Sequence, residues 1–81
     1  MARIIDGDRK NIVGYNVKRF RKMLNMSQQQ LADKLETEAV YICRGSISRI
    51  EDETRTVTDI EVRGLSKILK VSLEDLFKEE Y

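Results

Sequence analysis

Apolar residues return every three or four positions along most of this chain, with polar and charged residues between them. Such spacing puts the apolar side chains on one face of an α-helix. The chain has no proline and only four scattered glycines, so the turn signals that recur in β-hairpins are absent. The pattern therefore predicts an all-α fold of five short helices, over residues 11–24, 27–35 and 44–52 and from Thr58 and Ser72 onward.

Three of these helices begin with the same local signal. A hydroxyl-bearing residue is followed three positions later by Gln, Glu or Asp, which predicts reciprocal hydrogen bonds at the start of a helix. The pairs are Ser27 with Gln30, Thr58 with Glu61, and Ser72 with Asp75. The predicted core consists of the apolar stripes: Val13, Val17, Phe20 and Leu24; Leu31, Ala32 and Leu35; Ile47 and Ile50; Val62, Leu65, Ile68 and Leu69; and Leu73, Leu76 and Phe77. The last group has a second interpretation as a contact between two copies of the chain.

Two of the helices, within the stretch from Ser27 to Glu51, are joined by the connection Glu36–Arg44, which is predicted to be non-helical. In the second of them, Ile47 and Ile50 form the buried edge. At about 100° per residue, the opposite side carries Gly45, Ser48, Arg49 and Asp52, with Arg44 on the flank of the first turn. An outward face of small, hydroxyl and guanidinium side chains suits the major groove of DNA. This pair of helices is typical of a helix-turn-helix reader of DNA.

The length of the chain fits one small domain, and its charges are unevenly distributed along the sequence. A chain of 81 residues builds a single modest core, which argues against catalysis in a deep two-domain cleft. Its net charge of +1 combines +5 in residues 1–25 with −3 in residues 72–81. This distribution favours one face for an anion and another turned away from it, although an ordinary solvated helix surface is an alternative. Residues 1–10 show no periodicity and are expected to form a flexible N-terminal arm, followed by a single domain over residues 11–81.

Several classes of function lack their chemistry in this sequence. There is no histidine, no pairing of a nucleophile with a base, no metal-ligand spacing and no phosphate-binding loop, so we expect no enzyme, no catalytic or metal site and no cofactor. No apolar run is long enough to cross a membrane, and no secretory signal is present, so a cytoplasmic protein is expected. The single cysteine, Cys43, is interpreted as a small buried residue, with a redox-sensitive thiol at a helix N-terminus as the alternative.

The motifs MSQQQLADKL, SISRIE, RTVTDIE and LSKILKVSLEDLF resemble, in this order, the lambda-repressor-like Cro/repressor proteins, the XRE family of helix-turn-helix proteins. The resemblance covers about residues 11–77. It implies a compact five-helix bundle with the helix-turn-helix in helices 2 and 3, and a cytosolic dimer that binds double-stranded DNA operators.

The resemblance also implies roles for single residues. It places base contacts at Arg44, Gly45, Ser48, Arg49 and Gln28, phosphate contacts at Ser27, Arg55 and Arg19, and a structural ion pair between Arg21 and Glu51. An arginine can give two hydrogen bonds to guanine O6 and N7, but Arg49 can also pair with Glu53 at helical spacing. Ser27 and Gln28 can equally be no more than a helix start.

Three departures from the family pattern stand out. Glu36 replaces the usual glycine after the second helix, and the connection is about five residues longer, so the start of the third helix is predicted only to within two or three residues. Asp52 and Glu53 follow the third helix where Asn and Gly are usual, and two carboxylates near phosphate must weaken binding or point away. Lys70 stands where glycine or asparagine normally ends the fourth helix.

These observations predict a sequence-specific transcriptional regulator, a repressor that binds its operator as a homodimer. Two alternatives stay open. One is an antitoxin, which binds a toxin as well as DNA. The other is a protein-interaction adaptor that keeps the bundle without reading DNA; the acidic run Glu51–Glu53 favours it slightly, and Arg44, Arg49 and Arg55 argue against it.

Overall fold

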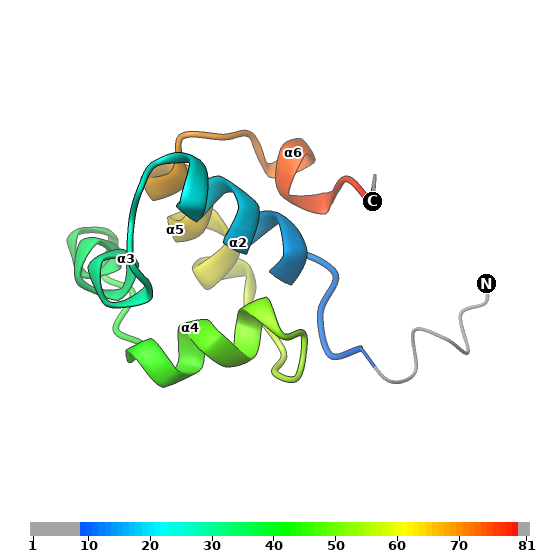
Figure 1. Cartoon of the computed structure of the whole chain (residues 1–81), viewed down its shortest axis with the longest axis horizontal. Coiled ribbons are helices and arrows are strands. Elements are labelled where there is room, and N and C mark those ends of the chain that lie inside the picture. The colour runs from blue at the N-terminus through cyan, green and yellow to red at the C-terminus, as the bar shows by residue number, and fades with distance from the viewer. Residues whose placement is uncertain (1–8, 80–81) are drawn as a thin grey trace.

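The computed structural model describes residues 9–79, which form a compact all-helical bundle without strands in that range (Figure 1). Its elements are α2 (Gly14–Met23), α3 (Gln28–Leu35), the 3-10 turn η1 (Glu36–Glu38), α4 (Arg44–Glu51), α5 (Asp59–Leu69) and α6 (Leu73–Phe77). The five predicted helices and the all-α class are confirmed. No helix among the described residues is long and apolar enough to cross a membrane.

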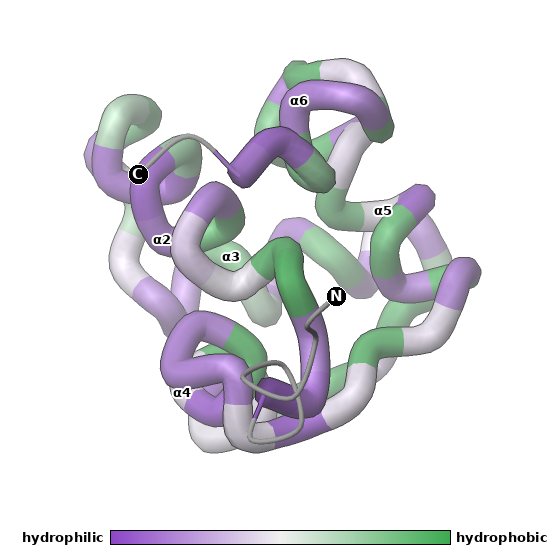
Figure 2. The backbone as a smooth tube through the Cα atoms, turned by 90° about the vertical axis from the view of Figure 1, so that its right-hand side faces the viewer, coloured by the Kyte–Doolittle hydropathy of each residue, from purple (hydrophilic) through white to green (hydrophobic). Residues whose placement is uncertain are grey.

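The helices surround one core, to which all five contribute. Helix α2 packs against α4, α5 and α6, while α3 packs against α4 and α5. In both backbone views α4 and α6 lie on opposite sides of the bundle (Figures 1 and 2). The side chains that are fully or almost fully buried are Val13, Val17, Leu31, Ala32, Leu35, Val40, Ile47, Ile50, Val62, Leu65, Leu69 and Leu76. Helix α4 is thus held at one side of the bundle with its outer face uncovered.

The three predicted capping boxes are present. Each hydroxyl accepts a hydrogen bond from a backbone N–H, and the third helical side chain bonds back to the cap, at Ser27, Thr58 and Ser72. The first helix differs from its prediction, because it begins at Gly14 and not at residue 11. The Asn11 side-chain oxygen accepts from the backbone N–H groups of Val13 and Gly14, which holds this segment in a turn before the helix.

Part of the predicted core lies at the surface. Leu24, Leu73 and Phe77 are 41%, 50% and 45% exposed, and from the last predicted stripe only Leu76 is fully buried. Helix α6 has five residues, so it turns too few positions toward the core to bury a whole stripe. Leu24 follows the last residue of α2, where the chain turns toward α3 and the helical face ends.

The long connection between α3 and α4 explains why Glu36 can stand where a glycine is usual. Glu36 has a right-handed backbone, with φ of −61°, and the chain continues into η1 before it turns at Ala39, with φ of 60°. Beyond that point Val40 returns to the core and is 4% exposed. Lys70 adopts the left-handed conformation that ends α5, with φ of 61°, so the backbone follows the family pattern although the residue does not.

Gly14 is required by a close approach of α2 to the end of α4. A Cβ atom at this position would lie 2.1 Å from the Ile50 carbonyl oxygen and 3.1 Å from that of Glu51. Neither atom is the end of a flexible side chain, so a larger residue must push the two helices apart. The glycine inside the helix is therefore explained by packing, which offsets its low helix propensity.

We expect Gly14→Ala to lower the free energy of unfolding by roughly 1–3 kcal/mol, because the added methyl group overlaps the α4 backbone. Urea denaturation followed by circular dichroism measures this change. Gly45→Ala is the matched control, since its Cβ would meet no heavy atom closer than 3.6 Å and alanine favours the helix. Equal stabilities of the two variants would show that α2 and α4 do not depend on this contact.

Candidate nucleic-acid interface

The outer face of α4 carries the side chains predicted to meet DNA bases. Ile47 and Ile50 are fully buried on its inner edge, whereas Arg44, Gly45 and Arg49 are exposed and Ser48 is half-buried. Among residues 9–79 the Arg44 guanidinium has no hydrogen-bond or ion-pair partner. This face is therefore available to a ligand, and α4 begins at Arg44 as predicted.

Arg49 makes a contact that was not predicted. Its Nη2 donates to the Ser46 hydroxyl at 3.2 Å. The alternative partner, Glu53, accepts instead from Arg9, whose Nε and Nη2 lie 2.9 and 3.2 Å from the two carboxylate oxygens. Arg49 thus pairs with no carboxylate among the described residues, and its charge remains available on the outer face of α4.

The side chains paired by the family resemblance, Arg21 and Glu51, form a buried ion pair between α2 and α4. Arg21 Nε and Nη2 donate to the two Glu51 oxygens at 2.6 and 3.0 Å, and Nη1 donates to the Met26 carbonyl at 2.8 Å. Gln28 Nε2, in the first turn of α3, donates to the same carboxylate at 3.0 Å. The Glu51 carboxylate of α4 therefore binds side chains from both α2 and α3. Because the Gln28 amide points at Glu51, the predicted base contact by Gln28 requires this bond to open or to be shared.

The start of α3 offers a second polar edge near α4. The Ser27 hydroxyl oxygen accepts from the Gln30 backbone N–H at 3.0 Å, and the Ser27 N–H donates to the Gln30 side chain at 2.8 Å. The remaining N–H groups of the first helical turn have no partner within the helix. Such groups attract anions, so the phosphate contact predicted for Ser27 fits the backbone geometry at this point.

The two other residues predicted to contact phosphate have partners inside the protein. Arg19 donates to Asn16 at 3.2 Å, and its guanidinium lies 4.5 Å from the centre of the Phe20 ring. Arg55 makes two hydrogen bonds to Glu61, both 2.9 Å long. The Arg55 guanidinium lowers the pKa of the Glu61 carboxyl, because it stabilises the charged form. Either arginine would have to give up these bonds in order to bind phosphate through the same nitrogens.

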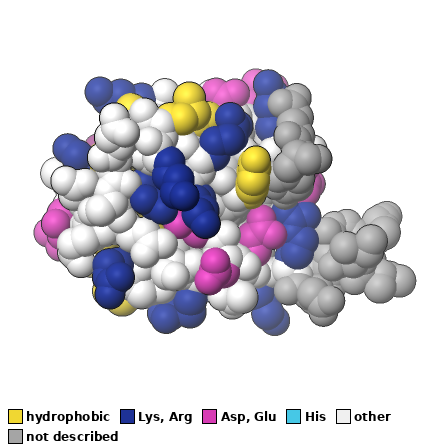
Figure 3. All heavy atoms as spheres, in the orientation of Figure 1, with side chains coloured by type: hydrophobic (Ala, Val, Ile, Leu, Met, Phe, Trp, Pro, Cys, Tyr) yellow, Lys and Arg dark blue, Asp and Glu magenta, His cyan; other side chains and the backbone are white. Residues whose placement is uncertain are grey.

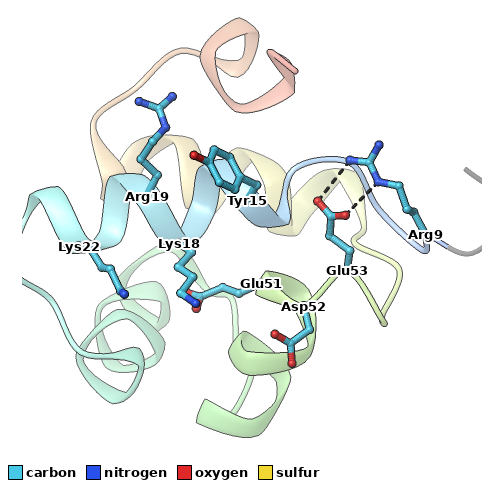
Figure 4. A pocket seen from close by; sticks show the side chains of 8 residues that line it. All are labelled: Arg9, Tyr15, Lys18, Arg19, Lys22, Glu51, Asp52 and Glu53. Carbon is cyan, nitrogen blue, oxygen red and sulfur yellow. Dashed lines mark hydrogen bonds and ion pairs between the residues drawn. The ribbon is translucent and has the colours of Figure 1, made fainter. Parts of the chain in front are cut away.

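Helix α2 presents basic groups that the sequence reasoning did not single out. Figure 4 shows the Lys18 side chain directed toward Glu51 of α4 and the Lys22 side chain on the same side of α2, nearer to α3, whereas Arg19 points the other way, toward α6. They line a shallow pocket of about 610 Å³ between α2 and the end of α4, with Arg9, Tyr15, Arg19, Glu51, Asp52 and Glu53. In Figure 3, basic side chains gather at the centre of this face, over α2, beside acidic ones. Lysines on the side of α2 where α3 and α4 lie are suited to contact DNA phosphate groups.

Asp52 and Glu53, the two acidic residues that depart from the family pattern, differ in their surroundings. Glu53 is paired with Arg9, and its backbone carbonyl also accepts from the Lys10 N–H at 2.9 Å. Residues 9 and 10, predicted to belong to a flexible arm, therefore contact the body of the domain, while residues 1–8 of that arm lie outside the described range. Asp52 is exposed at the end of α4. One of the two negative charges is thus compensated within the protein, and the other still faces solvent.

Cys43 is exposed, so its prediction as a small buried residue was wrong. It occupies the N-cap of α4, while Val40 and Ile42 supply the inward side chains of the connection. Its sulfur lies 3.6 Å from the Ser46 hydroxyl oxygen. Hydrogen bonds from Ser46 lower the pKa of the Cys43 thiol. No group of three or more residues suited to hold a metal ion occurs among residues 9–79.

Two short helices, joined by a connection that was predicted to be non-helical but begins with the 3-10 turn η1, define a helix-turn-helix domain, in which the second helix is exposed along its outer face. A family model described as helix-turn-helix, HTH_3, matches residues 17–76. The chain therefore belongs to this family, the XRE type of DNA-binding transcriptional regulators.

The comparison with solved structures gives the same fold. The restriction-modification controller protein C.AhdI from Aeromonas hydrophila superposes with a TM-score of 0.70 at 22% sequence identity, over 80% of this chain and 91% of that chain. No curated protein sequence gives a significant match.

We expect the Cys43 thiol to react with iodoacetamide at a lower pH than the thiol of a short unstructured peptide. A lowered pKa means that more thiolate is present at each pH below the ordinary titration range, and the thiolate is the nucleophile. The pH dependence of the alkylation rate gives the midpoint. Ser46→Ala should move that midpoint upward, and a wild-type midpoint at or above the peptide value would contradict the expectation.

Proposed function

We propose that this protein is a transcriptional repressor that occupies an operator as a homodimer and reads its sequence with α4 in the major groove. The observation that carries the proposal is the presence of two guanidinium groups, on Arg44 and Arg49, that pair with no carboxylate among residues 9–79. Both belong to the exposed face of a helix whose other side is fully buried. Guanidinium groups on such a face can donate two hydrogen bonds each to guanine.

The acidic side chains around this face support the proposal through their own pairing. Glu51 is neutralised by Arg21, and Glu53 by Arg9. These carboxylates would otherwise repel phosphate near the end of α4. Lys18 and Lys22 add positive charge on the neighbouring face of α2 (Figure 4). Phosphate contacts by Ser27, Lys18 and Lys22 would then position α4, while Arg44, Ser48 and Arg49 discriminate between bases.

The homodimer is proposed on the basis of apolar side chains that the fold leaves outside the core. Leu73 and Phe77 of α6 are about half exposed, and Ile60 of α5 is 55% exposed. Helix α6 lies on the opposite side of the bundle from α4 (Figures 1 and 2), so a contact through it leaves the reading face free. Two copies related by a twofold axis would address half-sites about one helical turn of DNA apart.

Selection of binding sites from a random duplex library tests the function. We expect an enriched site with two related halves and an affinity that falls steeply with salt, as bound counterions are released. An antitoxin would show the same DNA behaviour but would also bind a toxin. No enrichment together with a flat salt response would overturn the proposal and favour the adaptor.

Arg49→Ala should lower the preference for the selected site over random duplex by roughly five- to a hundredfold, since one good bidentate contact supplies this discrimination. Competition binding measures the ratio of the two affinities. Arg63→Ala is the matched control, because it removes the same charge from an exposed position on α5. Equal losses on both duplexes would mean that Arg49 meets only phosphate.

Phe77→Asp should shift the protein from dimer to monomer in sedimentation equilibrium, because a charge would be buried in the apolar contact. It should also weaken binding to the two-half site more than binding to a single half. Met23→Asp provides the control, since Met23 is an exposed apolar residue on α2. An unchanged oligomeric state would place the dimer contact elsewhere or remove it.

A further inference from the structure

The side chain of Arg49 runs backward along α4 toward the start of the helix. Its Nη2 reaches Ser46, three residues earlier, at 3.2 Å. Its Nη1 lies 3.6 Å from the point where a Cβ of Gly45 would stand, four residues earlier. Long helical side chains lean toward the N-terminus in general, and here the hydroxyl fixes how far the guanidinium travels.

The positive charge of Arg49 therefore lies beside the first turn of α4, although the Arg49 backbone belongs to the last turn. The backbones of Gly45 and Arg49 are about 6 Å apart along the helix axis. Because the guanidinium lies beside Gly45, it is presented from the first turn of α4, where Arg44 is also exposed. A Cβ atom at position 45 would make only ordinary van der Waals contact with Arg49 Nη1, so the guanidinium lies directly over this residue. The Arg49 guanidinium is therefore carried toward the end of α4 at which Arg44 lies.

We propose that Ser46 is a positioning residue for sequence readout, which holds Arg49 over Gly45 so that Arg44 and Arg49 address neighbouring base pairs. The proposal rests on the function proposed above and names the geometry of the operator contact. The ligand is a pair of adjacent base pairs with guanine edges in the major groove. The backbones of the two arginines are about 7.5 Å apart along the helix axis, so the side-chain position of Arg49 decides which base pair it can reach.

Two neighbouring contacts favour the bond between Arg49 and Ser46. Glu53 lies beyond the end of α4 in a left-handed conformation and is occupied by Arg9 through two hydrogen bonds, so it does not compete for Arg49. The Cys43 sulfur lies 3.6 Å from the same Ser46 oxygen. A serine hydroxyl has one proton and two lone pairs, so it can accept from Arg49 while it also bonds to the thiol. Ser46 thus stands at the centre of a short chain of polar contacts on the reading face.

The test compares the full-length wild type with Arg44→Ala, Arg49→Ala, Ser46→Ala and Ser46→Thr. Binding to the selected site and to all its single-base-pair variants is measured by equilibrium competition, with random duplex as reference. The two arginine variants identify the base pairs that each arginine reads. We expect these pairs to be adjacent. Ser46→Ala should reduce the preference at the Arg49 pair about three- to tenfold, the loss expected for one solvent-exposed hydrogen bond. It should leave the Arg44 pair and the random duplex unchanged.

Ser46→Thr keeps a hydroxyl and should restore the preference, which separates positioning from a general change of the helix. Thermal unfolding checks that each variant is folded. An unchanged preference in Ser46→Ala, with a clear loss in Arg49→Ala, would overturn the role of Ser46 and leave the proposed function intact. Base pairs two or more steps apart would overturn the shared first-turn readout. A selected site at which Arg49→Ala loses no preference would overturn base reading by Arg49 as well.

Discussion

The buried ion pair between Arg21 and Glu51 is the contact on which the arrangement of this domain depends. Their side chains are 9% and 2% exposed, and a charge in such a place is costly unless it is paired. Two hydrogen bonds join the pair, and Gln28 adds a third to the same carboxylate. Removing one partner of such a pair costs roughly 3–5 kcal/mol. The angle of α4 to α2 and α3 is therefore set by a contact that tolerates little adjustment.

The close approach at Gly14 also fixes the position of α4 against α2, at the opposite end of α2 from Arg21. With only a hydrogen in place of a side chain, α2 lies against the Ile50 carbonyl, and no space remains for the helices to slide. Asn11 adds two hydrogen bonds from its side-chain amide to the Ile50 and Arg55 carbonyls. The Asn11 amide thus joins the segment before α2 to the last turn of α4 and to the chain that follows it. In the function proposed above, a fixed α4 would let a few side chains discriminate between bases, because the orientation of the helix is set before binding.

Ion pairs also leave this nearly neutral chain with uncompensated positive charge on the outer face of α4. The net charge is only +1, yet the carboxylates of Glu51, Glu53 and Glu61 are each matched by an arginine. Arg44 and Arg49 have no such partner among the described residues. Overall charge therefore says little about this surface, because what matters is which charges remain uncompensated and where. The exposed α6 side chains lie on the other side of the bundle, so association of two copies and contact with DNA need not compete.

The sequence by itself determined the local structure. Capping boxes at Ser27, Thr58 and Ser72 and the apolar spacing defined the helices, since both signals act within a few residues. Only the tertiary structure decided that Leu73 and Phe77 stay outside the core and that Cys43 is exposed. It also decided that Glu53 pairs with Arg9, which lies 44 residues earlier in the chain, and not with Arg49. A periodic pattern shows which face of a helix is apolar, but burial and pairing depend on distant segments that compete for the same space and the same charges.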